Sequence, residues 1–506
     1  GDCRMCGVMG IIGDSQANVL LYEGLNILQH RGQDSSGIVT FESGNFYTEK
    51  GHGLVKDVFS GDTLTKLIGS QGIGHVRYPT SGKYSVQEAH PIYVNTPLGI
   101  YLSYNGNLTN TTELKTTLLN KHHRHINSYS DSEVLINVFA SALQKNIESG
   151  IETQKAIFLA VDEVHHRCTG AYAVIMLIAG HGLLAFRDPN GIRPLEYGTK
   201  NGAYVVASED IAIHSVNYNF VSSVQPGEAI LFKSSGGIAK SKYAKSLSLP
   251  KTCLFEYIYF ARPDSKIDGV SVYEFRCKLG KLLAKQIRAK GLDNKIDAIV
   301  PVPETSRHSA LALSQELGIP YKEGLVKNRY VGRTFIMPGK KTRKNSVRRK
   351  LAPLTEVFKN KSILLVDDSI VRGTTSREII KMIKSIGATR VFFASIAPAI
   401  RYPNVYGIDI PDANTLFAKK YNLEQMKCEL GVDELIFQNY EDVLQLLEQY
   451  SDCLSGAESS MFTGEYISGN ISTKYLQVLS KERSEHEQEK ALKDEGLNHS
   501  DLVINS

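Results

Sequence analysis

The stretch Ser362–Ser376, reading SILLVDDSIVRGTTS, constrains the fold of this 506-residue chain more than any other. Its four apolar residues, Ile363–Val366, are too few for a helix and are typical of a buried parallel strand. Two carboxylates, Asp367 and Asp368, follow where such a strand would end, and an apolar i, i+3, i+4, i+7 pattern then indicates a helix. The stretch predicts a strand–loop–helix unit of an open α/β fold, with its polar loop at the carboxyl edge of the sheet, where such folds bind ligands.

The residue types of this loop suit a phosphorylated sugar together with a metal ion. Gly373 lets the backbone approach a phosphate, and the N–H groups at the helix start, with hydroxyls beside them, supply donors. The adjacent carboxylates suit sugar hydroxyls and a hard cation. An ordinary surface turn, in which Asp and Thr are common, is the alternative. It accounts poorly for two acids and Gly-Thr-Thr-Ser within ten residues.

The stretch resembles the fingerprint of the type I phosphoribosyltransferases, which bind phosphoribosyl pyrophosphate. The resemblance implies an α/β domain with a parallel sheet, in which Asp367 and Asp368 contact the ribose hydroxyls and Mg²⁺. The segment Asp297–Ser306 reads as a strand running into a loop that matches the family's pyrophosphate loop, and Thr305 in it is implied as a further metal ligand. The implied phosphate contacts are Ser369, Arg372, Gly373, Thr374, Thr375 and Ser376.

The composition is that of an ordinary soluble enzyme with more than one domain. A chain of 506 residues is expected to form at least two cores. Hydrophobic residues make up 42%, and the net charge of +5 is too mild to indicate nucleic acid by itself. No apolar run approaches the ~20 residues of a membrane span, and nothing resembles a signal peptide. Seven scattered cysteines form no disulfide framework, so a cytoplasmic location is predicted.

Cys6 directly follows Met5 at the start of a predicted strand, Cys6–Gly13. If residues 1–5 were removed as a leader, the thiol and a free α-amino group would belong to one residue. That amine, with a pKa of ~7.7–8.0, is a base that works near neutrality. The alternatives are a buried structural cysteine and a zinc ligand paired with Cys3, which lacks the second cysteine pair that such a site needs.

Four polar segments follow in the first half of the chain, each with an ordinary structural alternative. A loop, His30–Gly37, follows the predicted helix Val19–Leu28, and Gly74–Thr80 follows another predicted strand. Asn105–Asn107 is a turn signal that also offers an amide side chain and an N–H to an oxyanion. Ser130–Glu133 opens an apolar-periodic helix as an N-cap with acids.

In this order, the segments resemble the glutaminase domain of the N-terminal nucleophile amidotransferases, over about residues 6–240. The resemblance implies an α+β fold of four layers, αββα. The sequence from Gly170 to Phe232 has a pattern typical of strands, which fits the antiparallel sheets of that fold. It implies that the Cys6 thiol attacks the glutamine amide, with its own amine as base. The other implied roles are the oxyanion hole (Asn105, Gly106), the glutamine clamp (Arg77, Tyr78, Asp131) and a position beside the nucleophile (Arg31).

The stretch Lys327–Lys350 holds ten Lys or Arg and no acid. Such runs can be solvated loops, localisation signals or nucleic-acid contacts. Between two α/β units it is better explained as a lid over an anionic substrate, to which Lys327 and Arg333 are assigned. The aromatic segment Phe255–Asp264 reads as packed core, and the resemblance also implies that its Tyr259 lies in the wall between two active sites.

Together the two halves resemble the glutamine phosphoribosylpyrophosphate amidotransferases, with the second domain at 255–470 and a helix and polar tail at 471–506. The implied reaction converts glutamine, phosphoribosyl pyrophosphate and water to phosphoribosylamine, glutamate and pyrophosphate. The family also implies a homotetramer and inhibition by purine nucleotides. Cys428 and Cys453 stand alone, so no iron–sulfur cluster is expected.

Two rival interpretations stay open at this point. Another glutamine amidotransferase would share the first half but not VDDSIVRGTTS. A regulator that senses phosphoribosyl pyrophosphate and binds nucleic acid would need a DNA-binding module, and the sequence offers no helix-turn-helix candidate.

Overall fold

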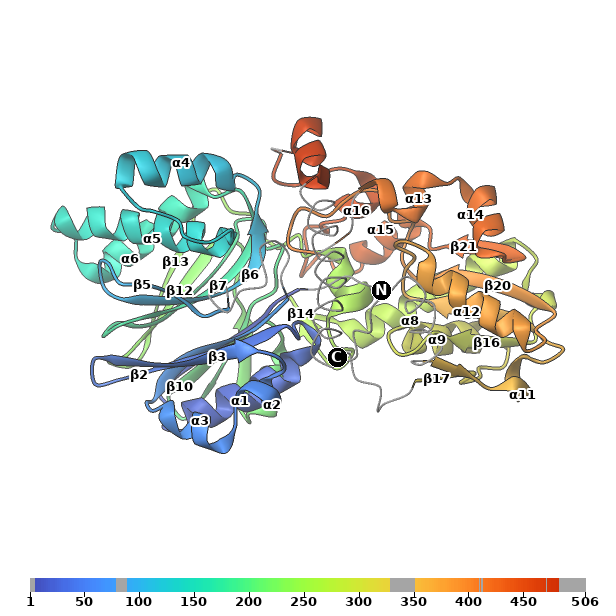
Figure 1. The fold of residues 1–506 in the computed structure, drawn as a ribbon, viewed down its shortest axis with the longest axis horizontal. Coiled ribbons are helices and arrows are strands. Elements are labelled where there is room, and N and C mark those ends of the chain that lie inside the picture. The colour runs from blue at the N-terminus through green and yellow to red at the C-terminus, as the bar shows by residue number, and fades with distance from the viewer. Residues whose placement is uncertain are drawn as a thin grey trace, which may run out of the picture.

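The computed structural model describes residues 5–78, 89–327, 351–408, 410, 413–469 and 471–481. Figure 1 shows two lobes side by side along the long axis, the first built from the amino-terminal half of the chain and the second from the carboxyl-terminal half. A short π-helical segment, η3 (Glu256–Phe260), lies where the chain passes from one lobe to the other.

Two antiparallel sheets form the centre of the first lobe. Alternate residues of their strands, Val8, Ile73 and Ile175 among them, pack between the sheets as a common core. The seven-stranded sheet has the order β11 (Asn219–Ser223), β9 (Glu196–Lys200), β10 (Ala203–Ala207), β1 (Gly7–Ile12), β4 (Gln71–Arg77), β2 (Ser35–Glu42), β3 (Asn45–His52). The six-stranded sheet has the order β13 (Ile238–Lys242), β12 (Glu228–Lys233), β8 (Gly182–Arg187), β7 (Gly170–Ile178), β6 (Ile100–Leu108), β5 (Ile92–Val94).

Helices cover the outer faces of both sheets, which gives the four-layer αββα arrangement expected from the sequence (Figure 1). Leu21 and Leu25 of α1 pack on β1 and β4, and apolar residues of α5 pack on β6 and β7. The helices on the seven-stranded sheet are α1 (Ala17–Ile27), η1 (Leu28–His30), α2 (Val55–Val58), α3 (Gly61–Lys66) and α7 (Asp210–Ser215). Those on the six-stranded sheet are α4 (Thr111–His122), α5 (Asp131–Glu148) and α6 (Thr153–Arg167).

A four-stranded parallel sheet forms the centre of the second lobe. Its order is β16 (Ala298–Pro301), β19 (Ser362–Asp367), β20 (Arg390–Ser395), β21 (Glu434–Phe437). β19 is buried apart from its last residue, as the apolar run at 363–366 predicts. Helices pack on both faces, with α12 (Thr374–Ser385) in one core and α8 (Val272–Ala289) in the other.

The remaining elements of the second lobe are short or lie at its edges. The helices are η4 (Asp293–Lys295), α9 (Arg307–Leu317), α11 (Thr355–Phe358), η5 (Ala413–Thr415), α13 (Phe417–Lys420), α14 (Leu423–Leu430), α15 (Tyr440–Glu448) and α16 (Ser460–Thr463). Two hairpins are formed by β14 (Lys266–Ile267) with β15 (Val270–Ser271), and by β17 (Leu325–Lys327) with β18 (Leu351–Pro353).

Buried polar contacts join the two lobes. Arg31 Nη2 lies 2.8 Å from Glu256 Oε2, and both side chains are fully buried. Arg187 makes a bidentate pair with Asp268, with N–O distances of 2.6 and 2.8 Å. Because a buried charge is costly without its partner, these pairs favour one arrangement of the lobes.

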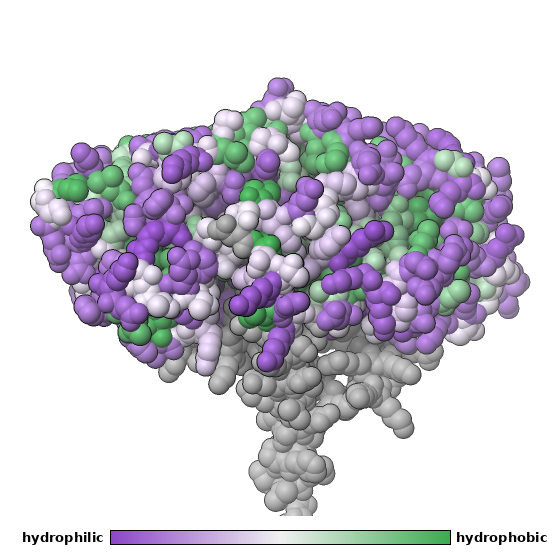
Figure 2. Space-filling view, turned by 90° about the horizontal axis from the view of Figure 1, so that it is seen from above, coloured by the Kyte–Doolittle hydropathy of each residue, from purple (hydrophilic) through white to green (hydrophobic). Residues whose placement is uncertain are grey.

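The surface is mainly hydrophilic on the face that Figure 2 shows, with hydrophobic residues in scattered patches. Exposed apolar residues such as Val19 and Leu119 are ordinary for a folded protein. None of the helices in the described part of the chain combines the length and apolar character needed to cross a bilayer.

Several local expectations were wrong. Asn105–Asn107 is not a turn but lies in the last part of strand β6. The segment Gly74–Thr80 was expected to follow a strand, but its first four residues, Gly74–Arg77, are themselves part of β4. Gly106 serves close backbone packing, because a Cβ there would lie 2.0 Å from Ala171 O in the neighbouring strand. β13 pairs with β12 at residues 238–242, so strand pairing continues past residue 240.

The chain beyond residue 471 begins with a helix, as expected, because the described residues are helical at 473–481.

Candidate functional site

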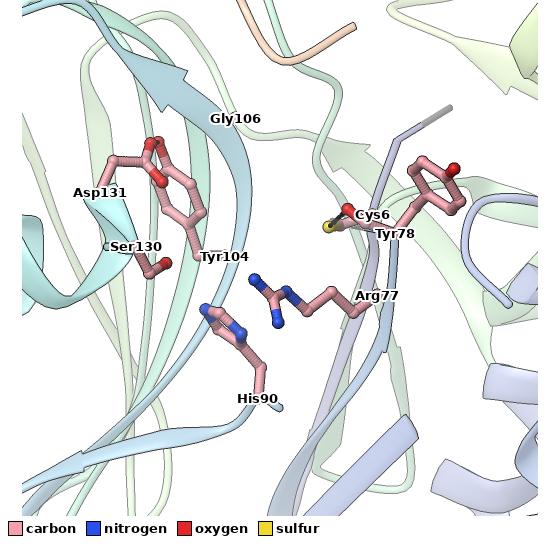
Figure 3. Close-up of a pocket in the computed structure, with 8 residues that line it drawn as sticks. All are labelled: Cys6, Arg77, Tyr78, His90, Tyr104, Gly106, Ser130 and Asp131. Atoms are coloured by element: carbon pink, nitrogen blue, oxygen red, sulfur yellow. Dashed lines mark hydrogen bonds between the residues drawn. The ribbon is translucent and has the colours of Figure 1, made fainter. Parts of the chain in front are cut away.

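A small pocket between the two sheets of the first lobe brings together five residues predicted for the glutamine site. The register places Gly7 of β1 opposite Val76 of β4, so Cys6 lies beside the end of the strand that carries Arg77. The pocket is lined by Cys6, Arg77, Tyr78, His90, Tyr104, Gly106, Ser130 and Asp131 (Figure 3). Its volume of about 20 Å³ is close to that of one water molecule, so glutamine enters only if the pocket widens.

The Cys6 thiol is neutral in this setting. Its Sγ donates weakly to Tyr78 O at 3.7 Å. Removal from water raises the pKa of Cys6 to about 12, against an opposing effect of the Arg77 cation, which lowers it. Attack on a carbonyl needs the thiolate, so this cysteine depends on a base to take its proton at neutral pH.

Asp131 lies in the pocket at the start of α5, where the helix dipole favours an anion. Its Oδ2 accepts from Tyr104 OH at 2.5 Å and from Leu108 N at 2.9 Å. Burial raises the pKa of Asp131, and these hydrogen bonds oppose the rise. Figure 3 shows the Arg77 guanidinium reaching into the same space from the opposite sheet. The pocket therefore offers a cation and a carboxylate to a zwitterionic amino acid.

Asn105 and Gly106 lie next to this pocket on β6. Gly106 lines it, and Asn105 pairs with Ala173, which packs in the core between the sheets. Paired residues point to the same face, so the Asn105 side chain faces the sheet that carries Cys6. Its Nδ2 is buried and has no hydrogen-bond partner among the described residues. An unsatisfied buried donor costs free energy, and an oxyanion would satisfy it.

Three further residues line the pocket, although the sequence assigned them no role in glutamine chemistry. His90 Nε2 lies 2.7 Å from Ser132 Oγ, which lies 2.5 Å from Ser130 Oγ, and the His90 ring stacks on His75 at 4.5 Å. Ser130 was expected as a side-chain helix cap, but it makes no such bond. Tyr104 holds Asp131 as described above. A single histidine or tyrosine carries no sequence signal that separates such roles from ordinary core packing.

Arg31 lies near the nucleophile, yet its guanidinium is engaged elsewhere. A Cβ on Gly7 would lie 3.4 Å from Arg31 Cβ, which places Arg31 beside the start of β1. Its Nε donates to Glu209, and its Nη2 donates to Glu256 of η3 in the second lobe. The carboxylates raise the pKa of Arg31, so its charge is permanent. This geometry supports a structural link between lobes, and the catalytic assignment stays a prediction.

The predicted phosphoribosyl site lies at the carboxyl edge of the parallel sheet. Asp367 ends β19, and its Oδ1 accepts from Asp368 N at 2.9 Å, while Ser369 Oγ donates to Asp368 Oδ1 at 2.8 Å. Burial, together with the Asp368 charge, raises the pKa of Asp367 to about 8. Two carboxylates held this close favour either a shared proton or a cation.

The start of α12 presents the expected phosphate donors beside the acid pair. Gly373 has φ of +70°, and a Cβ there would lie 3.0 Å from the Phe417 ring, so this position requires glycine. Thr374 and Thr375 are exposed at the first turn of the helix, whereas Ser376 is buried. Arg372 directly precedes the glycine. Exposed hydroxyls and N–H groups at a helix start form an anion-binding arrangement.

Thr305 lies in the loop after β16, the parallel neighbour of β19. Val302 N donates to Val366 O, so this loop leaves the same edge of the sheet as the acid pair. Lys327 is exposed at the end of β17, opposite Leu351 of β18. Arg333 and the rest of the basic stretch, 328–350, lie outside the described residues.

A second cavity, of about 420 Å³, is lined by residues of both lobes. From the first lobe it is lined by His30, Arg31, Gly32, Gln33 and Tyr78, and from the second by Tyr259, Phe260, Ala261, Arg262, Pro263, Arg276, Glu304, Thr305, Arg307 and His308. Tyr78 also lines the Cys6 pocket. Tyr259, expected in the wall between the sites, is in this lining and packs its ring on Phe255 and Phe260.

No cluster of three or more His, Cys, Asp or Glu side chains suited to a metal occurs within the ranges that the structure describes. The donors at the predicted Mg²⁺ site are two carboxylates and a hydroxyl. The expected lack of an iron–sulfur cluster stays a prediction.

Comparisons with known proteins agree with this geometry over nearly the whole chain. Models of a glutamine amidotransferase domain and a phosphoribosyl transferase domain match residues 80–215 and 275–405. Curated proteins named amidophosphoribosyltransferase are 48% identical in Pasteurella multocida, over 97% of this chain and 98% of that protein, and 44% identical in Saccharomyces cerevisiae, over 95% of each.

A solved structure of similar fold is the glutamine phosphoribosylpyrophosphate amidotransferase of B. subtilis complexed with ADP and GMP. It is 37% identical to this chain with a TM-score of 0.81, over 91% of this chain and 97% of that one. Because this identity extends over both halves of the chain, the similarity is not limited to one shared domain. The chain therefore belongs to the amidophosphoribosyltransferase family.

Proposed function

We propose that this chain carries out the purine-synthesis reaction of its family, glutamine-dependent amidotransfer to phosphoribosyl pyrophosphate, at two sites joined by a cavity. Glutamine, phosphoribosyl pyrophosphate and water give phosphoribosylamine, glutamate and pyrophosphate. The Cys6 pocket releases ammonia from glutamine, and the loop at Asp367–Ser376 holds the phosphoribosyl group that receives it. The observation that carries the proposal is that Tyr78 lines both the Cys6 pocket and the cavity that reaches Thr305.

At the glutaminase site, Arg77 binds the α-carboxylate of glutamine and Asp131 its α-amino group. Once residues 1–5 are removed, the free amine of Cys6 takes the thiol proton, and the sulfur adds to the amide carbon. Asn105 and Gly106 hold the oxyanion that forms. Its collapse expels ammonia with that proton, and water then cleaves the thioester to glutamate. Each role matches a charge or donor that faces the pocket.

At the transferase site, Asp367 and Asp368 bind the ribose hydroxyls, and Arg372–Ser376 bind the 5′-phosphate. The oxygen donors of Thr305, Asp367 and Asp368 suit Mg²⁺, which would neutralise charge on the departing pyrophosphate. Lys327 and Arg333 are assigned to the same polyanion. The raised pKa of Asp367 supports a site built to receive positive charge.

The cavity between the sites serves transfer of ammonia, because ammonia exposed to water at neutral pH would be protonated and lose its nucleophilicity. Tyr259 and Phe260 form an aromatic part of its wall, and much of the remaining lining is polar or charged. Replacement of Tyr259 by Ala should open this wall. Glutamate release should then exceed phosphoribosylamine formation, whereas the two are equal in the parent enzyme. Assays of both products in one reaction measure the ratio.

Tyr93→Ala is the matched control for Tyr259→Ala. Tyr93 is 48% exposed on edge strand β5 and lines neither cavity, so its loss should leave the product ratio at one. Ammonia-dependent synthesis should persist in both variants, since added ammonia does not need the wall. A ratio of one in Tyr259→Ala would contradict the proposed route.

The proposal also covers the regulation, the assembly, the location and the domain bounds of this chain. Inhibition by purine nucleotides is supported by the B. subtilis relative, whose structure holds ADP and GMP. A homotetramer and a cytoplasmic location follow from the family resemblance, as do domains at about 6–240 and 255–470. Binding of GMP by calorimetry and the mass in solution would test the first two.

A further inference from the structure

A loop of the second lobe, 404–408, contacts the strand that carries the candidate oxyanion donors. Asn107 Nδ2 donates to Val405 O at 2.9 Å. Gly407, at φ of +101°, packs directly on Gly106: a Cβ on Gly407 would lie 3.0 Å from both C and O of Gly106 and 3.2 Å from its Cα. The contact is between two backbones, so neither side has a flexible side chain that could move away.

The loop is held in place by its own lobe. Asn404 is fully buried, and its Oδ1 accepts from Tyr406 N at 2.8 Å and from Ile408 N at 3.2 Å. The Tyr406 hydroxyl bonds Ser468. The position of Gly407 is therefore set by the second lobe, independently of the glutaminase strand on which it packs.

Gly106 is confined from two directions. On β7 of its own sheet, Ala171 O is so close that a Cβ on Gly106 would lie 2.0 Å from it. Gly407 of the other lobe contacts the Cα, C and O atoms of the same residue. Oxyanion donors act only within about 2.7–3.1 Å of the developing charge, and loss of one costs about 10²–10³ in kcat. A glycine held between two backbones has the fixed position that its N–H needs for this role.

We propose that Val405 and Gly407 are positioning residues of the glutaminase oxyanion hole, supplied by the transferase lobe. Gly407 fixes Gly106 by contact with its Cα, C and O atoms, and Val405 fixes the end of β6 through Asn107. The inference rests on the proposed function in that it assumes hydrolysis at Cys6. It predicts that glutamine chemistry can be impaired from the second lobe without change to either substrate site.

Gly407→Ala in the enzyme trimmed to Cys6 should lower kcat for glutamine hydrolysis by about 10²-fold, because the methyl displaces Gly106. The KM for glutamine should stay unchanged, since Arg77 and Asp131 lie outside the contact. Ammonia-dependent synthesis should persist. Gly456→Ala is the matched control: its φ of +123° imposes similar backbone strain, but a Cβ there meets nothing within 4 Å. It should leave kcat unchanged.

A glutamine-derived aldehyde separates positioning from general disorder. The Cys6 sulfur adds to the aldehyde carbon, the thiol proton passes to the aldehyde oxygen, and the tetrahedral adduct places that oxygen in the oxyanion hole. Inhibition by the aldehyde should weaken in Gly407→Ala in step with kcat, whereas inhibition by the product glutamate should not change. Equal weakening of both, or an unchanged kcat, would overturn the inference.

Asn107→Ala provides a second variant in case Gly407→Ala loses the ammonia route through misfolding. It removes the donor to Val405 O without adding atoms. Because one hydrogen bond is lost, kcat and aldehyde inhibition should both fall by about 10-fold. Normal glutamine kinetics in this variant would count against the inference. Failure of Cys6→Ala to abolish glutamine use would instead refute the proposed function itself.

Discussion

Gly106 and Asp367 show how little of a residue's role is visible in its type. Asn-Gly is a turn signal, and the sequence accordingly predicted a turn. In the structure, the glycine lies in a strand, where the backbones of Ala171 and Gly407 leave no space for a Cβ. The oxyanion role of Gly106 stays a prediction, and the reason for glycine lies in contacts far away in the sequence.

Asp367→Asn tests the acid pair. Asparagine keeps the size of the side chain but cannot become a carboxylate, which is the form that binds a cation. Without the charge, the sugar and cation site is lost, and ammonia-dependent synthesis should fall by about 10²-fold or more. Glutamine hydrolysis at Cys6 should persist at a basal rate. Pyrophosphate and glutamate are assayed separately, and normal pyrophosphate release would contradict the assignment.

Among the elements, the π-helical segment η3 connects the two lobes most directly. It carries Tyr259 in the cavity wall and Glu256 in a fully buried cluster. Glu256 pairs with Arg31 at 2.8 Å and with Arg193 at 3.4 Å. Its aromatic composition predicted that this segment packs in the core, but not its buried carboxylate network, because partners from distant segments leave no local pattern.

Glu256→Gln should destabilise the protein by about 3–5 kcal/mol, since it leaves the buried Arg193 guanidinium without its anion and removes one of the two carboxylates paired with Arg31. The midpoint of denaturant unfolding measures the loss. Glu316→Gln is the comparison: its pair with Arg288 is 3.4 Å long and 39–48% exposed, so about 0–1 kcal/mol is expected. If both variants lost the same free energy of unfolding, the buried cluster would stabilise the protein no more than an exposed ion pair does.

For the whole molecule, the residues ahead of Cys6 decide whether the two sites work together. Met5 is fully buried, and its sulfur contacts Arg193, so this residue occupies the core beside the nucleophile. A peptide-bonded Cys6 has no free amine, and its thiol, with a pKa of about 12, stays neutral. The transferase site needs only ammonia.

The untrimmed chain should therefore make phosphoribosylamine from ammonia but not from glutamine, and trimming to Cys6 should restore the glutamine route. Cys6→Ser in the trimmed chain should remove it again. The ammonia route should strengthen as pH rises, because only the neutral form attacks. The glutamine route should fail as pH falls below the amine pKa of ~7.7–8.0, where the base is protonated. Equal glutamine use with and without residues 1–5 would refute the mechanism.

The sequence by itself determined what local pattern encodes. A buried apolar run followed by two acids specified β19 and its loop, and the apolar spacing after them specified a helix, which is α12. Motif resemblance supplied the order of the two halves. These features depend on neighbours along the chain, so they can be predicted from the sequence alone.

Tertiary structure decided what depends on residues that are distant in sequence. It brought His90 and Tyr104 into the Cys6 pocket, tied the Arg31 guanidinium to Glu256, and set Gly407 against Gly106. Each contact joins segments separated by tens to hundreds of residues, and its position follows from sheet register and from how the lobes pack. Sheet register and lobe packing leave no periodic signal in the sequence, because two residues in contact can be separated by any number of residues along the chain.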